Sequence, residues 1–465
     1  MDQDLYAWTA AELVAAYRRK ELSPVEVVRS VNARIEALEP KLHATWLFRP
    51  DLALEQARAS EARWKAGEPQ GALDGVPVTI KDNLATKGDA MPLGTAAYEL
   101  VPMADDSPAA ARLKECGTVF VAKTTMPDLG MLSSGLSSFH QLSRNPWDLT
   151  RTPGGSSAGA GAAAAACYGP LHAGTDIGGS VRLPASWCGI FALKPSQGRI
   201  PLSTPYMGRC AGPMTRTVED AALMMAVMSR PDGRDHSALP PAEIDWLSFD
   251  VEPAFLVGKR VGLLMDAGCG LPLDSQIAAA VREAAKRIED AGALVEEIPS
   301  FLTPKMLQGM DHFWRMRSLI DIQALSQDKA GKVLPFIRAW AESAAGFSGK
   351  HIFESHSQFI ATGSATYHAT KAYDFVISPV SPNLPAPAEH ASPTNDPLRA
   401  IEHVAFTVPY NMSEQPAASV NCGYSDEGLP IGLQVAGRRF DDLGVLQFSR
   451  AFEKIRAPQR PWPSL

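Results

Sequence analysis

The sequence predicts an α/β fold, and three observations carry that prediction. Short runs rich in β-branched residues, such as "GVPVTIKDNL" (75–84) and "GTVFVAKTTM" (117–126), are bounded by Gly, Asp and Asn, as buried strands are. Apolar segments with helical character lie between and after these runs, at 109–116 and 160–167. Strand and helix signals then alternate toward the C-terminus, which is the pattern of an α/β protein.

The first 65 residues are predicted to form helices. Two segments, "TAAE" from Thr9 and "SPVE" from Ser23, place a hydroxyl residue three positions before a glutamate, as in a capping box. Pro24 suits the first position of the second helix, and Pro40 is expected to end it. Apolar residues on one face of this helix predict that it docks on a larger body: Val28, Val31, Ile35 and Leu38.

The second half of the chain continues the same alternation after an interruption. Residues 229–257 include a stretch rich in Pro, Asp and charge, which predicts a surface excursion. A strand–helix–strand rhythm follows through "KRVGLLMD", 274–291 and "LVEEIPS", and helical material with Trp and Met covers about 303–370. Strand-like runs return in "YDFVISPV", "PAASVNCG" and "IGLQVAG", and "DDLGVLQFSRAFEKI" predicts a final helix.

Composition narrows the class of protein. The 465 residues include 44 Lys and Arg against 51 Asp and Glu, a net charge of −7, and no block of basic residues. Neither nucleic acid nor a membrane is therefore an expected partner. The six cysteines are scattered without metal-ligand spacing, which predicts reduced thiols and no metal site. Acidic residues stand where a secretory signal needs positive charge, so we expect a cytoplasmic protein.

An uncharged segment from Thr152 to Thr175 has three interpretations. It is long enough to cross a bilayer, but Ala, Gly and Ser dominate it, so insertion would be weakly driven. A flexible linker is a second interpretation, although "GGSSAGAG" passes directly into the strong helix former "AAAAAC". Glycines before a helix more often bring backbone N–H groups close to a reacting or anionic group, so we favour a catalytic centre.

The next cluster, "TDIGGSVRLPAS", supports the catalytic interpretation. Two glycines within residues 177–180 can turn several amides toward one point, as an oxyanion hole requires. Ser180 within such a turn is a candidate nucleophile.

A nucleophilic serine needs a base, and no histidine here carries a recognisable motif. His172 lies in an apolar strand-like run and is interpreted as packed or surface-exposed rather than catalytic. Lys81 ends the strand-like run "VPVTIK", and burial would lower its pKa until the neutral amine could act as a base. Taken alone, this strand favours the alternative in which the amine reaches water.

Several motifs together resemble one family. "GVPVTIKDN", "TPGGSSAGAGAA" and "GTDIGGSVRLPASWCGIFALKPS" are similar to the hallmark segments of the amidase signature family of serine hydrolases. The likeness continues through "KTTMPDLGM", "RNPWD", "GPMTRTVEDAALMM", "YDFVISPVSP" and "PYNMSEQPAASVNCGYSDEGLPIGLQVAGRRFDD", in the family's order.

The resemblance implies how the chain is organised. It implies one large domain over 1–465, with a central twisted mixed β-sheet covered by helices on both faces. The N-terminal helices would occupy 1–65 and the catalytic core 70–225, with 229–257 as a surface excursion. Residues 300–370 would form a variable helical region that contributes to the substrate pocket.

The resemblance also implies a Ser-Ser-Lys triad. Ser180 would be the nucleophile, Ser156 the bridging serine and Lys81 the base. In the family a cis peptide bond precedes the bridging serine, and Gly155 here makes that geometry sterically easier. Neutral Lys81 would take a proton from Ser180 through Ser156, and water would later hydrolyse the acyl-enzyme.

Neighbouring residues are expected to support this triad. The amides of Ile177, Gly178, Gly179 and Ser180 would form the oxyanion hole, and Ser157 would help by hydrogen bonding. Asp176 and Arg182 would either form the ion pair that fixes the nucleophile turn or be an ordinary surface pair.

Two departures from the family pattern leave substrate choice open. Ala158 replaces a glycine of the usual "GGSSGG", and Glu414 stands where glycine is common, so either could narrow or recharge the pocket entrance. Further pocket candidates are mostly apolar and favour a hydrophobic or aryl substrate, although Met and aromatic residues in long helices are more often core: Met131, Leu132, Ser133, Trp187, Met207, Trp314, Met316 and Tyr410.

The predicted function is an amidase that cleaves C–N bonds of small carboxamides without a metal or other cofactor. A carbamate, ester or anilide hydrolase is an alternative, because the same acyl-transfer machinery serves each. The A component of the amidotransferase that acts on glutamyl-tRNA(Gln) is another, although it typically reads "SDTGGSIRQPA" where this chain has "TDIGGSVRLPA". The expected partner is a small amide, with a homodimer as a candidate assembly.

Overall fold

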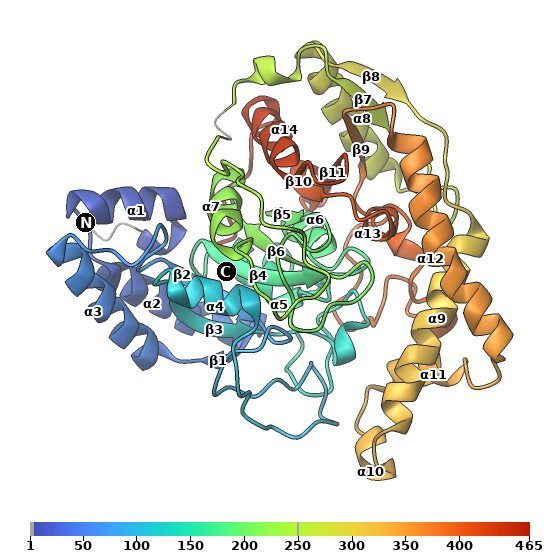
Figure 1. Ribbon diagram of the computed structural model, residues 1–465, viewed down its shortest axis with the longest axis horizontal. Coiled ribbons are helices and arrows are strands. Elements are labelled where there is room, and N and C mark those ends of the chain that lie inside the picture. The colour runs from blue at the N-terminus through green and yellow to red at the C-terminus, as the bar shows by residue number, and fades with distance from the viewer. Residues whose placement is uncertain (1–3, 249–250) are drawn as a thin grey trace.

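An 11-stranded mixed β-sheet organises the computed structural model, which describes residues 4–248 and 251–465 (Figure 1). In chain order the strands are β1 (Thr45–Phe48), β2 (Pro77–Lys81), β3 (Val119–Thr124), β4 (Leu171–Asp176), β5 (Phe191–Lys194), β6 (Cys210–Thr215), β7 (Arg260–Leu263), β8 (Leu294–Glu297), β9 (Phe375–Pro379), β10 (Ala417–Tyr424) and β11 (Pro430–Gly437). Their order across the sheet is β1-β3-β2-β4-β6-β5-β10-β11-β9-β7-β8.

Parallel and antiparallel pairing occupy different parts of this sheet. β2 runs parallel to β3 and β4, and β7 runs parallel to β8 and β9. Antiparallel pairs connect the strands between these two groups, from β4 through β6, β5, β10 and β11 to β9. The mixed sheet confirms the predicted fold class.

The helices form layers on both faces of the sheet. They are α1 (Ala10–Arg19), α2 (Pro24–Leu42), α3 (Pro50–Ala66), α4 (Pro108–Glu115), α5 (Ala158–Ala165), α6 (Arg182–Cys188), α7 (Val218–Met228), α8 (Ser275–Asp290), α9 (Pro304–Gln323), α10 (Gln327–Ala330), α11 (Pro335–Glu342), α12 (Gly349–Thr370), α13 (Val408–Met412) and α14 (Asp442–Ile455). Short 3-10 turns are η1 (Leu5–Ala7), η2 (Asp128–Gly130), η3 (Pro253–Leu256), η4 (Pro397–Arg399) and η5 (Glu402–Val404).

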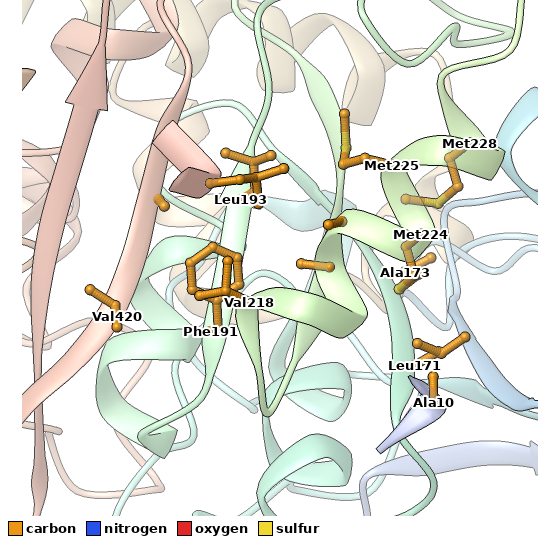
Figure 2. Close-up of a cluster of buried hydrophobic side chains, with 14 of the residues drawn as sticks. Ala10, Leu171, Ala173, Phe191, Leu193, Val218, Met224, Met225, Met228 and Val420 are labelled. Carbon is orange, nitrogen blue, oxygen red and sulfur yellow. The ribbon is translucent and has the colours of Figure 1, made fainter. Parts of the chain in front are cut away.

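Two groups of helices cover the middle strands. α14 packs against both α7 and α8, and all three helices contact β5, β6, β10 or β11. Figure 2 shows part of the resulting apolar core, which includes Leu171 of β4, Phe191 and Leu193 of β5, and Met224 and Met225 of α7. α5 packs on β2, β3, β4 and β6, α6 packs on β5, β10 and β11, and the two helices share a separate apolar cluster.

The N-terminal region departs from its prediction at two points. Both predicted capping boxes are present, at Thr9 and at Ser23. Pro40, however, does not end α2, which continues to Leu42. A proline in the last turn removes only one late hydrogen bond, and the left-handed backbone of His43 ends the helix instead.

Residues 45–48 were expected to be helical and instead form β1. Their sequence "TWLF" is rich in residues that favour strands, and β1 pairs antiparallel with β3 at the edge of the sheet. Tertiary pairing therefore decides the structure of this short segment.

The segments at 229–257 and at about 303–370 differ in their secondary structure. The described part of 229–257 is irregular apart from η3, and residues 249–250 of that range lie outside the described residues. Residues 304–370 form α9 to α12, and Figure 1 shows α9, α11 and α12 gathered at one side of the molecule. No helix within 4–248 or 251–465 is long and apolar enough to cross a membrane.

Candidate active site

Lys81 lies at the C-terminal end of β2 and points its amine at three hydroxyl groups. Its Nζ is 2.8 Å from Ser156 Oγ, 3.0 Å from Ser157 Oγ and 3.0 Å from Thr175 Oγ1. These oxygens come from the loop before α5 and from β4, which neighbours β2 in the sheet. All three are neutral, so the amine has hydrogen-bond partners but no carboxylate in direct contact.

The environment of Lys81 favours the neutral amine. The side chain is fully buried, with a relative exposure of 0%. Burial lowers the pKa of Lys81 well below its ordinary value, and the positive charge of Arg209 lowers it further, against smaller opposing effects of Asp176 and Asp82. The alternative in which this lysine reaches water is therefore wrong.

Ser156 and Ser157 precede α5, and a backbone hydrogen bond connects this segment to the turn that contains Ser180. The peptide bond between Gly155 and Ser156 is cis. A Cβ atom at Gly155 would lie 2.6 Å from the amide nitrogen of Ser134, so the site has no room for a larger residue. The Ser157 amide donates to the carbonyl of Ser180 at 3.2 Å, which joins the two serine-bearing segments.

Ser180 lies in the turn between β4 and α6, and a buried ion pair shapes that turn. Arg182 Nη2 lies 2.9 Å from Asp176 Oδ1, and the two side chains are 0% and 1% exposed. Although burial alone raises the pKa of Asp176, the charge and hydrogen bonds of Arg182 hold that pKa below its ordinary value. The surface-pair alternative for these residues is wrong.

The same carboxylate organises the backbone of the turn. Asp176 accepts hydrogen bonds from the amides of Gly179 at 2.8 Å and Val181 at 3.1 Å. Arg182 also donates to Gln434, Asn411 and the carbonyl of Thr407, which ties the turn to β11 and α13. The turn is thus fixed from several elements at once.

One predicted oxyanion donor is already engaged. Because the Gly179 amide donates to Asp176, the predicted set of four amides needs correction at this position. The remaining candidates in the set are the amides of Ile177, Gly178 and Ser180. The turn is held by Asp176 on one side and by Thr407, whose hydroxyl donates to the Gly178 carbonyl at 2.6 Å, on the other.

Two cavities meet at Ser180. The larger has a volume of about 510 Å³ and is lined by both Ser156 and Ser180. The smaller, about 50 Å³, also reaches Ser180, and Arg317 and His403 contribute to its wall. Most of its other side chains are apolar: Met131, Leu132, Ile177, Trp314, Ile401 and Val404. The exposed fractions of Ser156 and Ser180 are 4% and 9%, so the hydroxyls lie at the floor of a recess.

The predicted pocket residues separate into two groups. Met131, Leu132, Ser133 and Trp314 line the smaller cavity. The others line neither cavity, so their assignment to the pocket is corrected: Trp187 and Tyr410, which are buried, and Met207 and Met316, which are half-buried. Trp187 and Tyr410 are 1% and 0% exposed, because their rings fill the space between helices and the sheet.

The two departures from the family pattern lie outside both cavities. Ala158 is the first residue of α5 and is fully buried. Glu414 forms an ion pair with Arg439, and its φ of 61° is in the left-handed region where glycine is common. The expectation that these residues narrow or recharge the pocket entrance is therefore wrong.

His172 is part of the interior rather than the site. It is fully buried on β4, where Nδ1 lies 2.8 Å from Thr79 Oγ1 and Nε2 lies 3.2 Å from the Gly169 carbonyl oxygen. Burial lowers the pKa of this histidine to about 3. The side chain is a neutral, hydrogen-bonded part of the sheet, as its apolar surroundings in the sequence predict.

Four residues of the site were missed by the sequence analysis. Thr175 accepts from Lys81 and also from Asn83 Nδ2 at 3.0 Å, and both residues stand inside motifs already recognised. Asn83 lies two residues after Lys81 and Thr175 directly precedes Asp176, so the sequence could have indicated both as members of the site. Arg209 and Arg317 line the larger cavity, and neither stands in a sequence pattern that indicates a binding role.

Within the described ranges, no group of three His, Cys, Asp or Glu side chains could hold a metal ion.

Comparison with known proteins adds independent findings. The family model described as Amidase matches residues 26–446. The A component of the glutamyl-tRNA(Gln) amidotransferase from Myxococcus xanthus (strain DK1622) is 35% identical over 477 residues, which cover 96% of this chain and 96% of that protein.

Solved structures show the same likeness over the whole chain. A bacterial aryl acylamidase of the amidase signature family superposes with a TM-score of 0.88 at 29% identity, covering 96% of each chain. A 6-aminohexanoate cyclic dimer hydrolase in complex with its substrate gives a TM-score of 0.86 at 25% identity, covering 98% of each.

Proposed function

Since the chain belongs to the amidase family, whose model spans 26–446, we propose that it is an amide hydrolase with a Ser180–Ser156–Lys81 triad. The observation that carries the proposal is the fully buried Lys81 amine, 2.8 Å from the Ser156 hydroxyl beside the cavity that Ser180 also lines. An uncharged lysine amine in that position can accept a proton, as a general base must.

Acylation would begin with proton transfer along the triad. Ser180 Oγ attacks the carbonyl carbon of the amide while its proton passes through the Ser156 hydroxyl to Lys81 Nζ. The hydroxyls of Ser156 and Ser180 share no hydrogen bond in the described part of the chain, and such bonds often tighten only once substrate binds. The proton then returns to the departing amine, and water hydrolyses the ester by the same route.

The turn around Ser180 would stabilise the oxyanion. We assign this role to the amides of Ile177, Gly178 and Ser180, because the Gly179 amide is held by Asp176. Backbone donors that are fixed before the reaction stabilise developing charge without reorganisation. The ion pair of Asp176 and Arg182 therefore acts as a positioning element.

The smaller cavity favours an apolar group next to the reacting carbon. Trp314, Leu132 and Val404 offer hydrocarbon and aromatic surface there, with a volume of about 50 Å³. Such a wall suits a short hydrophobic or aryl group, and the aryl acylamidase with a similar fold supports this choice. Anilides are therefore the first substrates to test, with esters and carbamates as alternatives.

A second candidate is the amidotransferase A function, which the Myxococcus relative at 35% identity favours. The two functions differ in what the isolated chain can do. A stand-alone hydrolase releases amine from simple amides, whereas a transamidase component requires its partner protein and glutamyl-tRNA(Gln) for activity.

A panel of substrates run on the pure chain tests the proposal. It comprises aryl and alkyl amides, anilides, carbamates and esters, with Ser180→Ala as the matched control. We expect amine release from at least one amide or anilide and none with the variant. Activity that appears only after a partner protein and tRNA are added would favour the amidotransferase instead.

A further inference from the structure

Two arginines that the triad chemistry does not use face the larger cavity. Arg209 lies in the loop that leads into β6, and Arg317 lies on α9, so the two come from distant parts of the chain. Both share this cavity with Ser156 and Ser180. A positively charged wall beside a reacting centre needs an explanation.

Arg209 has only neutral partners. Its Nη1 donates to the carbonyl of Thr204 at 3.3 Å and to the hydroxyl of the same residue at 3.1 Å. Arg209 is at the same time part of the cavity wall. Its charge also lowers the pKa of Lys81, which places it within electrostatic reach of the catalytic amine.

Arg317 is held in place without an ion pair. Its Nη2 lies 3.0 Å from the sulfur of Met131, and its Cζ lies 5.1 Å from the ring centroid of Tyr206. Its Nε is buried and has no hydrogen-bond partner. A buried guanidinium donor without an acceptor is costly, so an anion in the cavity would stabilise this charged group.

The two guanidiniums are near enough to repel each other. Burial lowers the pKa of Arg209, and the charge of Arg317 lowers it further. Among the described residues, neither arginine forms an ion pair with a carboxylate. Asp321 also lines the cavity but is exposed, and Asp176 is already paired with Arg182. The cavity wall thus carries two guanidiniums and, besides the paired Asp176, one carboxylate, that of Asp321, so an excess of positive charge remains.

We propose that Arg209 and Arg317 form a subsite for a carboxylate on the substrate, an inference that rests on the proposed amide hydrolase. Guanidinium groups match the planar oxygens of a carboxylate, and a bound anion would satisfy the free donors and relieve their mutual repulsion. The substrate class is thus an amide that bears an acidic group in the larger cavity and an apolar group in the smaller one.

Paired sulfonyl fluorides test the subsite at Ser180 itself. In this reaction Ser180 Oγ bonds to sulfur, fluoride leaves, and the serine proton passes to the base. The charged probes are 3- and 4-(fluorosulfonyl)benzoate, which hold the carboxylate at two different distances from the reacting sulfur. The neutral probe is 4-methylbenzenesulfonyl fluoride. Labelling rates are compared in the parent chain, Arg209→Met, Arg317→Met and Arg317→Lys. Lys305→Met removes an exposed charge from the same helix and is the matched control.

We expect each methionine variant to lower the rate with at least one carboxylate probe by about tenfold or more, since charge-assisted hydrogen bonds contribute that much. Because Arg209→Met also raises the pKa of Lys81, all rates are compared at a pH above the labelling midpoint of every variant. There the ratio of each variant's rate to the parent rate with the neutral probe should differ from one by less than about twofold to threefold. Arg317→Lys should restore part of the loss, and Lys305→Met should change nothing. Equal losses with charged and neutral probes, or no loss with either, would overturn the subsite.

A binding measurement separates failure of the subsite from failure of the proposed function. Ser180→Ala chain, with and without Arg317→Met, is titrated calorimetrically with 4-acetamidobenzoate and with 4-methylacetanilide. We expect the arginine substitution to weaken only the carboxylate ligand, by about tenfold. If none of the three sulfonyl fluorides labels Ser180 but this difference persists, the hydrolase is refuted and the subsite stands. If binding of the carboxylate does not depend on Arg317, the subsite is refuted.

Discussion

Nζ of Lys81 donates a 2.8 Å hydrogen bond to Oγ of Ser156, although one residue ends β2 and the other precedes α5. The bond joins a buried amine to a hydroxyl that faces the cavity. Five predictions concern this arrangement and its supports.

Removing the amine should abolish activation of Ser180. Lys81→Met leaves Ser156 without a base, so labelling of Ser180 by phenylmethanesulfonyl fluoride should slow by about 100- to 10,000-fold. Intact-protein mass spectrometry follows the reaction. The matched control is Lys123→Met on the neighbouring strand, another buried lysine, whose Nζ binds the Leu84 carbonyl. Rapid labelling of Lys81→Met, or an equal loss in the control, would remove the lysine from the mechanism.

The pH dependence of labelling should report the pKa of Lys81. Because only the neutral amine is a base, the rate should rise with pH through one ionisation, with a midpoint well below 10.5, the ordinary lysine value. Arg209 lowers this pKa, so Arg209→Met should move the midpoint to higher pH. A midpoint that stays in place or moves to lower pH contradicts the assigned role of the Arg209 charge.

Thr175→Val should move the pH midpoint of labelling in the direction opposite to Arg209→Met. Its hydroxyl accepts from Lys81 at 3.0 Å and so helps to stabilise the protonated amine. Loss of this acceptor should move the midpoint to lower pH and, by leaving the amine less well positioned, slow labelling by about tenfold. Thr79→Val is the control, because it removes the bond to His172 and should affect stability alone. Identical profiles for the two variants would show that Thr175 is not coupled to the base.

The buried pair of Asp176 and Arg182 should be needed for both stability and activity. Asp176→Asn leaves an unpaired buried guanidinium and should lower the free energy of unfolding by about 3–5 kcal/mol. Urea denaturation measures this change. Glu297→Gln breaks the exposed pair with Arg282 and should change it by less than about 1 kcal/mol. Similar losses of unfolding free energy for the two variants would mean that the pair of Asp176 and Arg182 does not stabilise the turn.

The geometry of the turn predicts that alanine substitutions at Gly178 and Gly179 differ in their effect on stability. A Cβ at Gly179 would lie 2.7 Å from Thr407 Oγ1 on a backbone with φ of 125°, so Gly179→Ala should disrupt the turn and its stability. At Gly178 the nearest atom would be Trp314 Cη2 at 3.6 Å, so Gly178→Ala should fold normally. Thermal unfolding distinguishes the two variants, and equal destabilisation would contradict this description of the turn.

The proposed triad could be assigned from the sequence because its three members stand in local motifs. Lys81, Ser156 and Ser180 each stand in a short segment whose residue types match their chemistry, and a resemblance over nearly the whole chain relates the three segments. The structure then places Lys81 against Ser156. Strand alternation alone did not reveal whether the lysine was buried, because burial depends on what covers the sheet.

The pocket was harder to predict, for a physical reason. Trp314 and Tyr410 are alike as large aromatic residues in a sequence, yet one lines the smaller cavity and the other fills the interior. Arg209 and Arg317 meet only because the loop before β6 and α9 converge on the same cavity. Such convergence is a property of tertiary packing, and no pattern along the chain records it.

The most direct measurement is to trap the acyl-enzyme. The chain is quenched in acid during turnover of the best amide in the substrate panel, digested and mapped by mass spectrometry. The mechanism predicts one acyl group, on the peptide that contains Ser180, and neither adduct nor turnover in Ser180→Ala. An acyl group on another residue, or turnover that survives in Ser180→Ala, would contradict it.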